Sequence, residues 1–227
     1  MYSSLRKPLA IAVASVFSLP LYAQTAGGTA EPSSALLEEV IVTGTRVENR
    51  TSFDAMAPVD VVSEEALNSV ASSELVDKLT HITPSFNVQR LPMNDGLIYV
   101  RPATLRGLSP DHTLVLVNGK RRHRSALLGF RGAQGADLAQ IPSFAIKRIE
   151  VLRDGASAQY GSDAIAGVIN LILDDTEGFS SYIQGSQYSE GDGDELQVGL
   201  RAGLNLADKG TLTGTLEYTD ADPTSRS

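Results

Sequence analysis

The residues of this chain that could do chemistry are few, and their spacing matches no catalytic or metal site. Its three histidines, His81, His112 and His123, are scattered and lack the spacing of a metal-ligand set. Ser157 lies in the sequence Gly-Ala-Ser-Ala-Gln, which lacks the second glycine of a hydrolase nucleophile elbow. The glycine-lysine pair at residue 119 lacks the other residues of a phosphate-binding loop. We therefore expect no enzymatic activity, no metal site and no cofactor.

Composition narrows the class of protein further. The chain has 227 residues, a formal net charge of -8 and no cysteine. Without cysteine it has no disulfide, no thiolate metal site and no cysteine nucleophile. The acidic balance argues against a general nucleic-acid binder, so we expect no nucleic-acid partner.

The densest charge cluster is the basic run Lys120 to Arg124, which reads KRRHR. One interpretation is a solvated loop with structural salt bridges. A second is binding to nucleic acid or anionic membranes, which the acidic remainder of the chain disfavours. A third is attraction of an anionic ligand, because arginine forks match carboxylate and phosphate oxygens.

Short strands and helices must position these residues. Strands are predicted at 59–62, 114–117, 146–152 and 168–173, with helices that begin near Ser63 and Ser73. The run 114–117 has no polar alternation, as expected of a strand buried on both faces. In 146–152, Ile149 and Val151 alternate with Arg148 and Glu150, which predicts a half-buried strand with one charged face. Between the last two strands, glycines and small residues indicate a constrained connector.

Two blocks closely resemble the plug domain of TonB-dependent outer-membrane receptors. Val151 to Leu173 (VLRDGASAQYGSDAIAGVINLIL) resembles the signature at the end of that plug. Leu105 to Arg122 (LRGLSPDHTLVLVNGKRR) resembles its earlier motif of Arg-Gly, an apolar strand and a basic turn. The resemblance implies an α+β fold with a small mixed-sheet plug domain and short helices over residues 45–175.

The same resemblance implies two uses for charged residues. Plug loops of this family reach towards the external ligand, which gives a set of candidate ligand contacts: Arg121, Arg122, His123 and Arg124. Other charged plug residues face the surrounding barrel, which gives a set of candidate plug–barrel contacts: Arg106, Arg148, Glu150 and Arg153. The sequence alone does not separate the two uses.

The N-terminus has the features of an exported protein. Residues 1–23 form a predicted signal peptide, with Arg6 and Lys7 before the apolar run Leu9 to Leu19. This run is shorter than the roughly 20 residues of a membrane-spanning helix. Residues 24–37 are rich in Gly, Ala, Ser and Thr and are predicted to be a flexible linker.

After the linker, residues 38–44 form an isolated β-branched run, EEVIVTG. It can be the first strand of the domain core, or a strand offered to the sheet edge of a partner. The run resembles a TonB box, which implies that TonB of the inner-membrane energy-coupling complex binds Glu39, Val40, Ile41, Val42 and Thr43. We call Glu39 to Thr43 the coupling segment.

The pattern changes to long alternating strands over residues 176–227. From Leu196 to Leu206 apolar residues alternate with Gln, Gly, Arg and Asn, and Thr211 to Thr219 continues the pattern after a short turn. Ser180 to Tyr188 is a weaker first strand. The lengths match tilted membrane-spanning strands, although a soluble half-buried hairpin has the same period. With the resemblance, we expect the first three antiparallel strands of a transmembrane β-barrel. Because plugged barrels have about 22 strands, we expect a truncated receptor.

These observations predict the N-terminal part of a receptor for energy-coupled uptake of a scarce ligand, foremost a ferric siderophore. The expected partners are TonB, outer-membrane lipid around the barrel, and a small molecule such as an iron chelate. The expected location is the outer membrane, or the periplasm if the chain cannot insert. The alternative is a secreted periplasmic module that binds a ligand or protein and has no transport role.

Overall fold

The computed structural model describes residues 40–41, 43, 50–51, 58–88, 99–129, 132–189, 191–206 and 210–223. The predicted signal peptide and linker lie outside the described residues, as do Glu39 and Val42 of the coupling segment. The predicted domain boundaries at the N-terminus therefore stay predictions.

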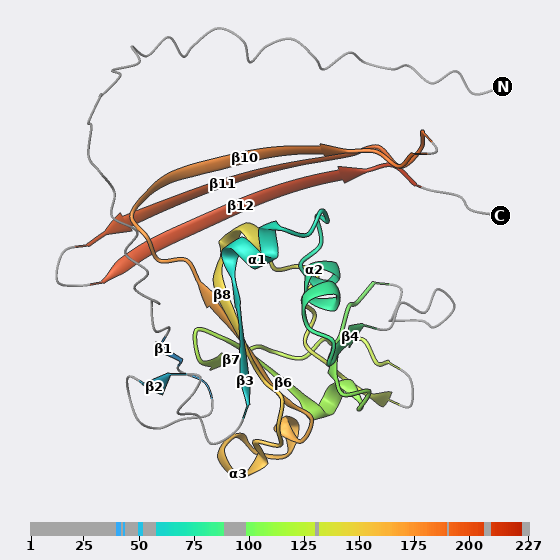
Figure 1. Ribbon diagram of the computed structural model, residues 1–227, viewed down its shortest axis with the longest axis vertical. Coiled ribbons are helices and arrows are strands. Elements are labelled where there is room, and N and C mark those ends of the chain that lie inside the picture. Colours follow the sequence, from blue (N-terminus) through green and yellow to red (C-terminus); the bar gives the residue numbers. More distant parts are fainter. Residues whose placement is uncertain are drawn as a thin grey trace, which may run out of the picture. The chain divides into compact units, whose positions relative to one another are not determined.

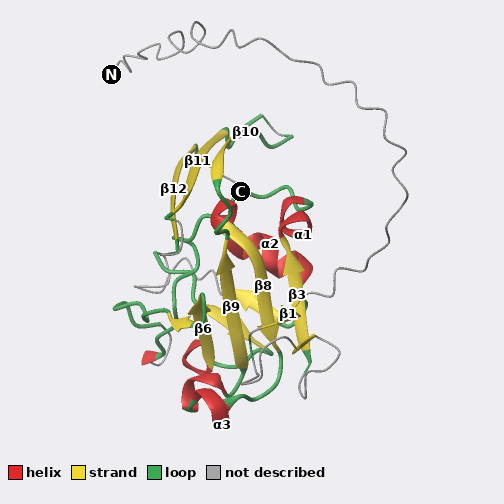
Figure 2. Ribbon diagram, turned by 90° about the vertical axis from the view of Figure 1, so that its left-hand side faces the viewer, coloured by secondary structure: helices red, strands yellow, loops and turns green. Residues whose placement is uncertain are grey.

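A five-stranded mixed sheet forms the centre of the first domain (Figure 2). Its strands, in spatial order, are β3 (Val59–Ser63), β8 (Ile146–Leu152), β9 (Gly167–Leu173), β6 (Thr113–Val117) and β7 (Lys120–Arg121). β6 and β9 are parallel, and the other neighbours are antiparallel. The predicted mixed sheet is confirmed.

Each face of this sheet carries its own apolar cluster, because side chains alternate along a strand. On one face, α1 (Glu64–Asn68) and α2 (Leu75–Ile82) pack Leu67, Val76 and Leu79 against Ile149 and Ile169. The side-chain oxygen of the cap residue Ser63 accepts a hydrogen bond from the Ala66 N–H at 3.3 Å. The other face buries a smaller cluster, formed by Val59, Leu114, Leu116, Leu152, Ala164 and Val168.

Shorter elements complete the domain. β1 (Val40–Ile41) pairs with β2 (Arg50–Thr51), and β4 (Phe86–Val88) pairs with β5 (Ala103–Leu105). Single turns of 3₁₀ helix, η2 (Pro110–His112) and η4 (Ser143–Ala145), precede β6 and β8 directly.

The connector between β8 and β9 is as constrained as its glycines predict. It contains α3 (Ser157–Tyr160) and η5 (Ser162–Ala164), which lie at one end of the sheet in Figure 2. Gly167 has φ 141°, and a Cβ there would lie 2.3 Å from the Leu152 carbonyl oxygen. Only glycine fits where the chain enters β9.

One expectation for β8 is wrong. Glu150 was expected on a charged outer face, but it is 0% exposed. A buried carboxylate requires hydrogen-bond partners, and a segment distant in sequence supplies two of these hydrogen bonds, as described below.

A separate antiparallel sheet follows the first domain (Figure 1). Its strands are β10 (Gly178–Ser186), β11 (Glu195–Asn205) and β12 (Thr211–Ala221). Along β11, Gln197 and Arg201 are buried, whereas Leu196, Leu200 and Leu204 are 42 to 60% exposed. This is the reverse of a soluble half-buried sheet and matches the outward apolar face of a barrel wall. Among the described residues, no helix is long and apolar enough to span a membrane.

Candidate functional site

Thr43, the last residue of the coupling segment, is held inside the first domain. It is 1% exposed. Its backbone N–H donates to Glu150 Oε2 at 2.9 Å, and its hydroxyl donates to the same oxygen at 2.5 Å. Asn170 Nδ2 donates to the Thr43 hydroxyl oxygen at 2.9 Å. The end of the segment therefore contacts both central strands, because Glu150 lies on β8 and Asn170 on β9.

The two strand residues have further partners. Arg148 contacts Glu150 Oε1 through Nε and Nη2, each at 3.1 Å. The Asn170 side-chain oxygen accepts a hydrogen bond from the Gly119 N–H at 3.0 Å. Glu150 and Asn170 are direct cross-strand neighbours, so the network lies across the middle of the sheet.

The other described residues of the coupling segment, Val40 and Ile41, lie outside the five-stranded sheet. Among the described residues, Val40 pairs with Thr51, and Ile41 pairs with Arg50. The two interpretations of this run, a first strand of the domain core and a strand offered to a partner, both stay predictions. A ladder outside the main sheet is compatible with a strand offered to a partner.

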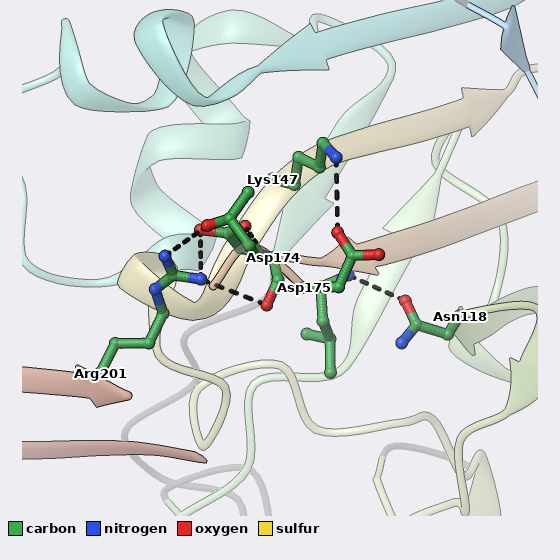
Figure 3. A network of polar contacts seen from close by, with 7 residues as sticks. Asn118, Lys147, Asp174, Asp175 and Arg201 are labelled. Carbon is green, nitrogen blue, oxygen red and sulfur yellow. Dashed lines mark hydrogen bonds and ion pairs between the residues drawn. The ribbon is translucent and has the colours of Figure 1, made fainter. Parts of the chain in front are cut away.

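A second polar network joins the two sheets where the chain leaves β9 (Figure 3). Arg201, in the middle of β11, forms an ion pair with Asp174 Oδ2 at 2.5 Å and donates to the Thr176 hydroxyl at 2.6 Å. The Arg201 and Asp174 side chains are only 9% and 14% exposed. Next to them, Asp175 pairs with Lys147 at 3.4 Å, and the Asn118 side-chain oxygen accepts from the Leu173 N–H at 2.9 Å.

The environment of Asp174 favours its charged form. Burial alone would raise the pKa of Asp174. Hydrogen bonds from the Thr176 backbone N–H and hydroxyl, together with the Arg201 guanidinium, outweigh that effect and lower the pKa of Asp174 below its usual value. The carboxylate is therefore a stable partner for Arg201 at neutral pH.

Sequence reasoning missed a third set of contacts, which lies where α2 and η4 of the first domain approach the second sheet. The ring of Phe144 packs edge-on against Tyr182 of β10, with 4.7 Å between the centroids. The Tyr182 hydroxyl donates to Glu217 of β12 at 2.6 Å. Lys78 of α2 donates to the Ser143 hydroxyl at 3.0 Å, and burial lowers the pKa of Lys78 against the opposing effect of Glu217. No local pattern in the sequence marks these residues as neighbours.

The basic run 120–124 is partly engaged in the first domain itself. Arg121 and Arg124 form ion pairs with the two oxygens of Asp163, at 2.8 and 2.7 Å. Arg122 lines a cavity of about 270 Å³ together with Asp174. Its Nε is buried and has no hydrogen-bond partner among the described residues. The side chain of His123 is exposed.

The four candidate plug–barrel residues make contacts inside the first domain. Arg106 donates to the carbonyl oxygens of Ala166 and Ile165, at 3.0 and 2.9 Å. Arg153 pairs with Asp60 at 2.7 Å, and Arg148 pairs with Glu150 as described above. Their predicted role in meeting a barrel stays a prediction.

The described part of the chain contains no group of three or more His, Cys, Asp or Glu side chains that could hold a metal ion. The arrangement is therefore best described by its two polar networks. One ties the coupling segment to the sheet, and the other ties the first domain to β11.

Comparisons with known proteins agree with the division of the chain into a first domain and a following antiparallel sheet. Residues 51–168 match the family model of the TonB-dependent Receptor Plug Domain. The chain is similar to the Vitamin B12 transporter BtuB of Vibrio cholerae, with 32% identity over 213 residues that cover 93% of this chain and 31% of the relative. BtuB of Photobacterium profundum is 35% identical over 133 residues, which cover 59% of this chain and 20% of that protein.

Solved structures give the same fold. The siderophore receptor PirA from Acinetobacter baumannii superposes with a TM-score of 0.55 at 28% identity, over 72% of this chain and 25% of that chain. The ferric enterobactin receptor PfeA from Pseudomonas aeruginosa has a TM-score of 0.56 at 24% identity, over 73% of this chain and 25% of that chain. The present chain thus spans about a third or less of the length of each relative.

Proposed function

Because the chain belongs to the TonB-dependent receptor family, with its plug domain over residues 51–168, we propose that the complete receptor takes up a scarce ligand with energy delivered by TonB. The ligand class that we propose is a ferric siderophore. The solved siderophore receptors with this fold support it, while the similarity to vitamin B12 transporters makes cobalamin the second candidate. The plug holds the path closed until TonB acts on it.

We propose that Glu39, Val40, Ile41, Val42 and Thr43 bind TonB by adding a strand to the sheet of the partner. Main-chain hydrogen bonds would supply the affinity, and alternate side chains would supply the specificity. The observation that carries this proposal is the position of Thr43, whose N–H and hydroxyl are bound to the buried Glu150, so that the residues before it offer the strand while Thr43 attaches that strand to the plug. A segment attached in this way can pass force from a partner to the plug.

We propose the outer membrane as the location. The support is the outward face of β10, β11 and β12, on which apolar side chains gather; they are Phe179, Ile183, Leu196, Leu200, Leu204, Leu212, Leu216 and Tyr218. Lipid is the solvent that suits such a face. The alternative, a soluble periplasmic module, would expose all of these side chains to water.

The basic residues belong to the proposal as well. Arg121, Arg122, His123 and Arg124 are proposed to attract an anionic ligand, and three of them, Arg121, His123 and Arg124, are exposed. Arg106, Arg148, Glu150 and Arg153 are proposed to position the plug in its barrel. The contacts of the three arginines inside the plug support an indirect role, in which they shape the surface that meets the wall, while the buried Glu150 acts through its ion pair with Arg148.

Uptake measurements test the proposed function. Cells that carry the complete receptor would be given radiolabelled ferric enterobactin and, separately, radiolabelled cyanocobalamin. We expect accumulation of one probe only in cells with TonB, and loss of that accumulation in the variant Val42→Pro. Proline removes a ladder donor and fixes φ, so it prevents strand addition while surface binding of the probe stays. Equal accumulation with and without TonB would contradict the proposal.

A further inference from the structure

The coupling segment is attached to the plug by chemistry that its sequence does not reveal. On the basis of the proposed function, we infer that Glu150 and Asn170 anchor Thr43, so that a pull on the segment acts first on the central strands β8 and β9. We call Thr43, Glu150 and Asn170 the Thr43 anchor. Glu150 and Asn170 are positioning residues, because they act on the segment through Thr43.

The anchor is almost completely shielded from water. Thr43, Glu150 and Asn170 are 1%, 0% and 1% exposed. Its three hydrogen bonds measure 2.9, 2.5 and 2.9 Å, and they join residues 107 and 127 positions apart in the sequence. The Thr43 hydroxyl both donates and accepts, so it fills a place between a carboxylate and an amide that a hydrocarbon side chain cannot fill.

The chemistry of Glu150 makes release of Thr43 costly. Oε2 accepts both hydrogen bonds from Thr43, whereas Arg148 contacts the other oxygen. When Thr43 leaves, Oε2 loses both of these donors inside a buried site. Removing these donors from a buried carboxylate oxygen costs more free energy than removing the same donors at the surface, because water replaces them there. Thr43 therefore leaves only when the site opens to water or when the strands move with it.

The anchor also determines where a pull is transmitted. The described residue pairs of β1 and β2, Val40 with Thr51 and Ile41 with Arg50, lie outside the five-stranded sheet, whereas the bonds of Thr43 lie within it. Glu150 and Asn170 pair directly across β8 and β9. β9 then leads into Asp174, which is bound to Arg201 of β11. Asn170 also accepts from Gly119, the second residue of the turn before the basic run. Force at the segment thus reaches the interior of the plug before its periphery.

The mobility of the segment tests the anchor without TonB or ligand. A spin label at Glu39→Cys, in the complete receptor in outer-membrane vesicles, reports the ratio of mobile to immobile signal. We expect this ratio to rise roughly tenfold in Thr43→Val, because two hydrogen bonds of the hydroxyl are lost while the shape is kept. Glu150→Gln is expected to raise the ratio in the same direction.

Thr104→Val is the matched control. Thr104 is also buried in the plug, at 4% exposure, and its hydroxyl donates to the Asn87 carbonyl oxygen at 2.7 Å. The control removes a comparable buried hydroxyl but leaves the coupling segment untouched, so the ratio should match that of the receptor with Thr104. Thr43→Ser retains the hydroxyl and should restore the immobile signal.

Two outcomes would overturn the anchor: an unchanged ratio in Thr43→Val, or a mobile signal in Thr43→Ser equal to that of Thr43→Val. The second would show that the segment is released by any change of the Thr43 side chain and not specifically by loss of its hydroxyl. Failure of the proposed function would be recognised differently, as uptake that does not depend on TonB in the receptor without substitutions.

Discussion

At the residue scale, one glycine determines whether an aromatic contact between the two sheets can form. A Cβ at Gly199 of β11 would lie 2.0 Å from Cε1 of Tyr182 on the neighbouring strand. The ring of Tyr182 therefore lies directly over the glycine. From there it reaches Phe144 of the plug and donates its hydroxyl to Glu217. The absence of a side chain at Gly199 is what lets one tyrosine contact both partners.

The variant Gly199→Ala tests this contact. We expect it to displace the Tyr182 ring, break its contacts with Phe144 and Glu217, and destabilise the protein by about 1–3 kcal/mol, as overpacking typically does. The measurement is the midpoint temperature of unfolding of the purified receptor, read from the change in its heat-modifiable mobility on gels.

Gly214→Ala serves as its control, because Gly214 lies on β12 and a Cβ there would meet no atom within 4 Å. It removes the same backbone freedom without touching Tyr182. Equal thermal midpoints for the two variants would show that Tyr182 does not need the space above Gly199.

At the element scale, the junction between β9 and β10 connects plug to wall through Asp174. The folded state lowers the pKa of this carboxyl below its usual value. A lowered pKa contributes stability that is fully present above the unfolded-state value of about 3.9. That contribution is lost as the pH falls through the lower folded-state value. The junction should therefore weaken in acid.

Thermal unfolding of Asp174→Asn from pH 7 to pH 3 measures this contribution. At pH 7 the variant should be less stable than the protein with Asp174, because Arg201 loses its buried ion pair. Below about pH 4 the difference should shrink, since Asp174 itself becomes protonated. A difference that stays constant across this range would contradict the role of the charge.

Asp175→Asn is the comparison for this series. The Asp175 side chain is 65% exposed and its partner Lys147 is 48% exposed, at a distance of 3.4 Å. Exposed pairs of this kind contribute about 0 to 1 kcal/mol. The variant should therefore unfold close to the unsubstituted protein at every pH.

At the scale of the whole molecule, two sheets with opposite surface polarity lie in one chain. The plug buries its apolar residues on both faces of the mixed sheet, whereas β11 buries Gln197 and Arg201 and exposes its leucines. This contrast follows from the two environments proposed for them, the interior of a barrel and lipid. The polar faces meet at the junction of Asp174 with Arg201.

The long strands could be predicted well from the sequence. Alternation predicted strands at 196–206 and 211–219, and the structure has them at Glu195–Asn205 and Thr211–Ala221. The period of two is unambiguous over such lengths, because each slip by one residue would reverse every side chain. Motif resemblance predicted the mixed-sheet plug in the same way, from continuous stretches.

The networks could not be predicted, because their members are far apart in sequence. Alternation assigned Glu150 to an outer face, but in the structure Thr43, 107 positions away, packs on it and Glu150 is buried. In the sequence, Arg201 is one of several polar residues along β11, although in the structure it forms the ion pair with Asp174 that connects the first domain to the second sheet. Local patterns specify which face a side chain takes, and not which distant segment covers that face.

The most direct measurement of the central claim is photo-crosslinking of the coupling segment in living cells. A photoreactive amino acid would replace Ile41 in the complete receptor, and a second receptor would carry it at Lys120, an exposed plug residue outside the segment. We predict an adduct with TonB from position 41, absent from position 120 and absent in cells without TonB. If a receptor that fractionates with the outer membrane gives no TonB adduct from position 41, the segment does not couple to TonB and the account is wrong.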